Sequence, residues 1–147
     1  MARAAISGFD DVDKMFEKLM KPKETAMKAV DSAAPELKKA VQSAIKSVDV
    51  GYGTGRLAAS FEATKAKENQ YGVYSVVRPV GGRDGIDYRT RASWVEFGRF
   101  RKGNKKGSNS QIQPARPFRQ KAINDAKNKC EDMMEKTINE FIDDATR

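Results

Sequence analysis

Apolar residues recur at three- and four-residue steps in two long stretches of the chain, a spacing that predicts amphipathic helices. The first stretch spans residues 23–48, and Pro35 interrupts its apolar stripe. Because proline lacks a backbone donor and clashes with the preceding turn, we expect a kink or a break near Ala34. A shorter helix is predicted over residues 10–20, ending before Pro22.

The second long stretch spans residues 117–144 and begins with a proline, which is favoured in the first turn of a helix. Its apolar series consists of Phe118, Ala122, Ala126, Cys130, Met133, Met134, Thr137, Phe141 and Ala145. This series keeps helical spacing throughout. We therefore expect a long C-terminal helix.

Between these helices the pattern changes to alternation among β-branched and aromatic residues. Residues 57–67 and 71–80 are expected to pair as an antiparallel hairpin, because a short polar turn separates them. One face of the second strand should carry Tyr71, Val73, Ser75 and Val77, and the other face Tyr74 and Val76. Closely spaced glycines predict turns at residues 51–55 and 81–85.

Residues 88–97 are too few for periodicity to separate helix from strand, and we favour a helix. Residues 99–113 are rich in glycine, asparagine and basic residues and are expected to form a flexible loop. The predicted fold class is therefore α+β in one domain, 1–147. A small antiparallel sheet would pack against N-terminal helices and a long C-terminal helix.

Histidine is absent from the 147 residues, which removes the usual general base and the commonest metal ligand. Catalytic triads of the serine or cysteine type are therefore excluded, and we expect no enzyme, no cofactor and no metal site. A nuclease that binds Mg²⁺ through Asp84, Asp87 and Glu96 is the enzymatic alternative, although their spacing fits no known site. The single Cys130 is expected to be a buried free thiol.

No apolar run is long enough to span a bilayer, and residues 1–10 lack the apolar core of a signal peptide. We therefore expect a protein that stays in a cytoplasm and does not associate with membranes.

The net charge of +8 is concentrated in the middle of the chain. Residues 78–106 contain nine basic and three acidic residues, an excess of six. The candidates for contact with DNA or a protein partner are Arg99, Arg101, Lys102, Lys105 and Lys106. Such a segment can bind phosphates without reading sequence, dock on an acidic neighbour, or only aid solubility.

Three short motifs follow one another along the chain. Residues 54–57 read Thr-Gly-Arg-Leu with Ser60 leading into a strand, residues 94–98 read Trp-Val-Glu-Phe-Gly, and residues 114–118 read Pro-Ala-Arg-Pro-Phe. Together they resemble the head–tail joining or tail-completion family of long-tailed bacteriophages. Arg99 stands where that family commonly has a threonine, and the basic loop after it is long.

The resemblance implies a structural subunit of the head–tail junction that lets DNA pass. It implies a homo-oligomer, a hexameric ring in the particle, with the tail terminator, tail tube and connector as partners. The expected location is the virion, and the host cytoplasm during assembly. The alternative is a nonspecific DNA-binding protein, whose affinity would fall steeply with salt.

Each motif residue also has a physical expectation. Gly55 would relax a turn that directs Leu57 into the core, and Gly98 would allow a sharp exit after Phe97. We expect Trp94, Phe97 and Phe118 to meet in the core, with Pro117 starting the last helix.

The carboxylate of Glu96 is costly to bury unpaired. It should therefore pair with an arginine such as Arg116, lie at the rim, or form a salt bridge between subunits.

Overall fold

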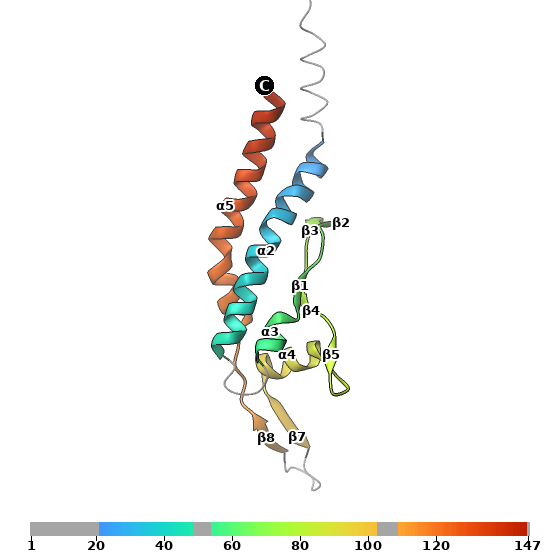
Figure 1. Ribbon diagram of the computed structural model, residues 1–147, viewed down its shortest axis with the longest axis vertical. Coiled ribbons are helices and arrows are strands. Elements are labelled where there is room, and N and C mark those ends of the chain that lie inside the picture. The colour runs from blue at the N-terminus through green and yellow to red at the C-terminus, as the bar shows by residue number, and fades with distance from the viewer. Residues whose placement is uncertain (1–20, 49–53, 103–108, 147) are drawn as a thin grey trace, which may run out of the picture.

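The computed structural model describes residues 21–48, 54–102 and 109–146 of the chain. Two long helices, α2 (Pro22–Val48) and α5 (Arg119–Thr146), lie side by side along its long axis (Figure 1). The smaller elements lie beside α2, and one β-hairpin extends from the lower end (Figure 1). The α+β class is confirmed. The helix expected over residues 10–20 lies outside the described part.

Mainly alanine is buried along the helix pair. The buried alanines are Ala29, Ala33, Ala34 and Ala44 of α2, and Ala122, Ala126 and Ala145 of α5. Short side chains let two helices approach closely, and here polar groups also meet between the helices. The Thr137 hydroxyl donates to Ser32 Oγ at 3.0 Å, and Cys130 Sγ lies 3.6 Å from the carbonyl of Ala33. Cys130 is a free thiol but is half-buried, so its expected full burial is wrong.

Pro35 does not interrupt α2, which continues from Pro22 to Val48 as one helix. A break near Ala34 is therefore wrong, whereas a kink at that point, the other expectation, stays a prediction. Proline removes one backbone hydrogen bond. Contacts between α2 and α5 lie on both sides of Pro35, at Ser32 with Thr137 and at Ser47 with Lys121, and they hold the helix together across that position.

The predicted hairpin is present but begins later than expected. At its base, β1 (Phe61–Ala63) pairs with β4 (Val77–Pro79), and at its tip β2 (Lys67–Asn69) pairs with β3 (Gly72–Tyr74). Residues 57–59, expected in the first strand, instead end a short helix, α3 (Thr54–Ala59). The backbone nitrogen of Ala66 donates to Asp31 Oδ1 at 2.5 Å, which fastens this hairpin to α2.

A tight hairpin of β5 (Gly82–Arg83) and β6 (Ile86–Asp87) leads into α4 (Tyr88–Phe97). The helix favoured over residues 88–97 is therefore confirmed. Asp87 caps it, because its side chain accepts a hydrogen bond from the backbone nitrogen of Arg89 at 2.7 Å.

The loop expected over residues 99–113 is wrong at both ends of that range. There, β7 (Arg99–Lys102) and β8 (Asn109–Gln113) pair as an antiparallel hairpin with a register shift between Arg99 and Phe100. Hydrogen bonds between the two strands satisfy the backbone donors and acceptors of these residues, although their polar composition alone had predicted a loop. Residues 103–108, and with them the glycines at 103 and 107, lie outside the described part.

The main core lies where the C-terminal half of α2 meets α3, α4, β1 and the start of α5. It comprises Ala44, Ile45, Leu57, Ala58, Phe61, Ala92, Val95, Phe118 and Ala122. The rings of Phe61 and Phe118 meet edge to face, with their centroids 6.1 Å apart. Leu57 and Phe118 are buried as expected, whereas Trp94 is only half-buried. Phe97 is 65% exposed, so its predicted place in the core is wrong.

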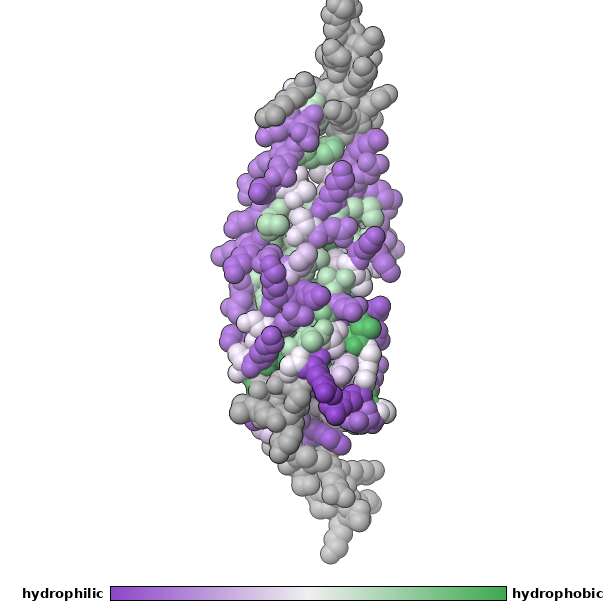
Figure 2. Space-filling model, viewed as in Figure 1, coloured by the Kyte–Doolittle hydropathy of each residue, from purple (hydrophilic) through white to green (hydrophobic). Residues whose placement is uncertain are grey.

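Most of the visible face of the molecule is hydrophilic, with hydrophobic residues in an interrupted band between the helices (Figure 2). Within the described residues, no helix has the length and apolarity that crossing a membrane requires.

Candidate functional site

Two of the three sequence motifs, 94–98 and 114–118, come together at the root of the β7–β8 hairpin. The backbone nitrogen of Arg116 donates to the carbonyl of Val95 at 2.7 Å. Gly98 ends α4, its nitrogen donating to the carbonyl of Trp94 at 2.9 Å. We call residues 94–98 and 114–119 the hairpin clamp, because they join α4, the hairpin and α5.

Gly98 is required by the geometry of this clamp. Its φ of 83° and ψ of 169° are almost confined to glycine. A Cβ atom there would lie 2.9 Å from the carbonyl oxygen of Gln113 and 3.0 Å from the nitrogen of Ala115. The sharp exit expected after Phe97 is therefore present, and the backbone of residues 113–115 approaches Gly98 too closely for a side chain.

Glu96 performs a task that sequence reasoning missed. Its Oε2 accepts hydrogen bonds from the backbone nitrogens of Phe118, at 3.0 Å, and Arg119, at 3.2 Å. The first nitrogens of a helix have no partner within the helix, and a carboxylate there also meets the positive end of the helix dipole. Glu96 therefore caps α5 from another element.

Arg116 is not the partner of Glu96. Its Nη1 instead donates to the carbonyl of Val48, the last residue of α2, at 3.3 Å. This bond satisfies one of the free carbonyls at the end of that helix. The clamp therefore links the end of α2 to the start of α5 as well.

Pro117 lies two residues before α5 rather than in its first turn, and it is exposed. The carbonyl of Phe118 accepts the first intrahelical hydrogen bond, from Ala122 at 2.9 Å, so Phe118 is the N-cap residue.

The first motif does not join the clamp. Gly55 lies within α3, where no described atom comes within 4 Å of an added Cβ, so the turn expected there is wrong. Leu57 is buried from the same helix, and the hydroxyl of Ser60 donates to its carbonyl at 2.6 Å. The part of the expected turn at residues 51–53 lies outside the described part.

The predicted contact residues divide into three groups. Arg99 is exposed on β7 and its guanidinium lies 4.0 Å from the centroid of the Trp94 ring, a cation–π contact that orients it. Arg101 and Lys102 are also on β7, but only their backbone is described. Lys105 and Lys106 lie outside the described part.

No acidic residue occurs between Glu96 and Asp125, whereas eight basic residues do. They are Arg99, Arg101, Lys102, Lys105, Lys106, Arg116, Arg119 and Lys121. The hairpin and the start of α5 therefore form a segment with charge of one sign. A like-signed field of this kind attracts phosphates or an acidic protein surface.

The three carboxylates of the nuclease alternative serve separate structural contacts. Asp84 pairs with Arg83 at 3.4 Å and with Arg91 at 3.6 Å, Asp87 caps α4, and Glu96 caps α5. In the part of the chain that the structure describes, no three ligating residues are grouped as a metal site.

No protein-family model, no curated protein and no solved structure matches the chain.

Proposed function

We propose that the protein is a structural subunit of the head–tail junction of a long-tailed bacteriophage, assembled with tail and connector proteins around the path of the DNA. One observation carries the proposal. Two motifs behind the resemblance, separate in sequence, form a single clamp that fixes a basic hairpin at one end of the described molecule.

The clamp explains why such residues would occur together in a structural subunit. Its glycine, carboxylate and backbone contacts hold the hairpin at a defined angle to the two long helices. A projecting element of fixed orientation suits an assembly in which each copy must meet neighbours in the same way. The proposed subunit is a homo-oligomer in the particle, a hexameric ring, and its partners are the tail terminator, tail tube and connector.

The test is copurification with the products of genes adjacent to its own. We expect the wild-type protein to retain a tail or connector protein, and Gly98→Val to lose it, because this variant redirects the hairpin. Gly55→Ala is the matched glycine control and should bind normally. If the wild-type protein binds none of the neighbouring gene products, the proposal is wrong.

A nonspecific DNA-binding protein is the second candidate, favoured by the eight basic residues that no acidic residue interrupts. It predicts binding to duplex DNA whose affinity falls linearly with salt on a log–log plot, with a slope of about 0.9 per phosphate contact. Replacing Arg101, Lys102, Lys105 and Lys106 with serine should flatten that slope. Lys65→Ser with Lys67→Ser, two exposed lysines elsewhere, is the control.

A further inference from the structure

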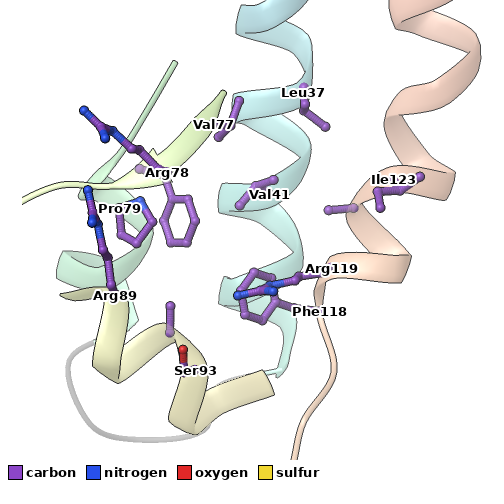
Figure 3. Close-up of a pocket in the computed structure, with 13 residues that line it drawn as sticks. Leu37, Val41, Val77, Arg78, Pro79, Arg89, Ser93, Phe118, Arg119 and Ile123 are labelled. Atoms are coloured by element: carbon purple, nitrogen blue, oxygen red, sulfur yellow. The ribbon is translucent and has the colours of Figure 1, made fainter. Parts of the chain in front are cut away.

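An open apolar groove of about 390 Å³ lies between α2, the start of α5, β4 and α4 (Figure 3). Leu37 and Val41 line it from α2, Phe61 from β1, and Phe118 and Ile123 from the start of α5. Ile123 is 52% exposed although it borders this apolar surface. The groove therefore presents apolar area that the described part of the chain leaves in contact with solvent.

Three arginines border the groove. Arg78 of β4 and Arg89 of α4 lie on one side, and Arg119 lies beside Phe118 on the other (Figure 3). Neither Arg78 nor Arg89 forms an ion pair with any described carboxylate, and both are exposed. An apolar floor with free cations at its edge is complementary to a surface that is apolar and acidic together.

The C-terminal half of α5 carries such a surface. Ile138 and Ile142 are 41% and 43% exposed and lie one turn apart on the same face. Glu131 and Glu135 each precede one of these isoleucines by seven residues, which places them near that face. Residues 131–146 contain six acidic residues and one basic residue, Lys136, which pairs with Glu140.

This surface cannot reach the groove of its own chain. Ile123 borders the groove, and Ile142 lies 19 residues further along the same helix. At 1.5 Å per residue they are separated by about 28 Å. Only the α5 of another molecule can bring the two surfaces together.

We propose that the groove binds the C-terminal half of α5 from a second copy of this chain. Ile138 and Ile142 contact the apolar floor, and Glu131 and Glu135 face Arg78 and Arg89. The inference rests on the proposed function, because it names the contact through which the subunit would assemble. It joins two different surfaces head to tail, the type of contact that closes into a ring or extends as a filament.

The test uses two variants that each damage one surface. Arg78→Glu with Arg89→Glu damages the groove, and Ile138→Asp with Ile142→Asp damages the helix. Each variant alone should be monomeric by light scattering after size exclusion, whereas the wild-type protein associates. Their equimolar mixture should form a 1:1 dimer that grows no further, because it contains one intact pair of surfaces.

Two controls separate this contact from general effects of charge or folding. Lys65→Glu with Lys67→Glu reverses two exposed charges, one on β2 and one on the connection between β1 and β2. Tyr71→Asp adds a charge at an 87% exposed aromatic residue. Both should associate as the wild-type protein does. Far-UV circular dichroism should show the same helix content in every variant.

Three results would each overturn the inference: a mixture that stays monomeric, a single-surface variant that associates like the wild type, or a wild-type protein that is monomeric at ~1 mM, where a Kd of 1 mM is detectable. These outcomes differ from failure of the proposed function. A monomer that still copurifies with a tail or connector protein leaves that function standing. A protein that self-associates but binds neither a tail protein nor a connector protein would support the contact between copies and contradict the proposed function.

Discussion

The Oε2 atom of Glu96 lies 3.0 Å from the backbone nitrogen of Phe118, 22 residues later in the chain, and accepts its hydrogen bond. The first turn of α5 is therefore fixed to the last turn of α4. Because Phe118 is also the largest fully buried side chain, this bond orients the central residue of the core.

Glu96→Ala should lower the free energy of unfolding by about 1–2 kcal/mol, since two backbone nitrogens at the start of α5 lose their acceptor. Glu96→Gln should cost about half as much, because its amide oxygen can still accept. Urea denaturation measures both, and Glu62→Ala on the exposed side of β1 is the control. Equal stability of Glu96→Ala and the control would show that the cap contributes nothing.

The two motif glycines should respond in opposite directions to alanine. Gly98→Ala should destabilise the protein by about 2 kcal/mol or more, because its φ of 83° is strained for alanine and the Cβ meets the backbone of Gln113. Gly55→Ala should stabilise it by about 0.5 kcal/mol, because the residue lies in a helix with open space. The midpoint of thermal unfolding, measured for both variants and the wild type, tests these two predictions. A lower midpoint for Gly55→Ala would contradict the placement of Gly55 in a helix.

Replacing each of the two phenylalanines of the clamp with alanine should lower the free energy of unfolding by very different amounts. Phe118→Ala should remove about 3–5 kcal/mol, since its side chain is 2% exposed and packs against Phe61. Phe97→Ala should remove less than about 1 kcal/mol, because its ring is 65% exposed and the Arg119 guanidinium lies as far as 5.6 Å from its centroid. Chemical denaturation of both variants in parallel measures the difference, and similar losses would contradict it.

Burial raises the pKa of the Cys130 thiol above its usual value of 9.0, and the negative charge of Glu36 raises it further. The folded state therefore holds this proton more tightly than the unfolded chain. Its contribution to stability is complete below the unfolded pKa and is lost as pH rises above about 9 through the folded pKa.

Alkylation of Cys130 by iodoacetamide at pH 8 should accordingly be slower in the native protein than in urea, because less of the thiol is ionised. Cys130→Ser provides the blank. A native rate equal to the rate in urea would mean that the thiol is neither buried nor perturbed.

Periodicity predicted the long elements because it reflects burial on one face of each helix. Ala122, Ala126 and Ala145 are buried at the spacing that identified the last helix. Composition gave the wrong prediction where pairing between two strands determines the backbone conformation. Residues 99–113 contain polar and glycine positions typical of a loop, yet strands form at both ends, because hydrogen bonding between strands is not visible in either one alone.

The candidate site was only partly predictable for a related reason. Gly98 could be recognised as a turn residue, because glycine chemistry is local. The partners of Glu96 could not be predicted. A carboxylate near the core is expected to pair with an arginine such as Arg116, whereas the donors that it meets are two backbone nitrogens. The arginines of the groove come from β4, α4 and α5, and no short motif joins them.

The Thr137 hydroxyl meets Ser32 across 105 residues of sequence. The chain between these residues must close as a loop before α2 can pair with α5, and the entropy cost of that closure is part of the barrier to folding. During synthesis, α2 leaves the ribosome long before its partner helix exists. Its alanine face therefore stays exposed to solvent and to chaperones until residues 119–146 have been synthesised and have left the ribosome.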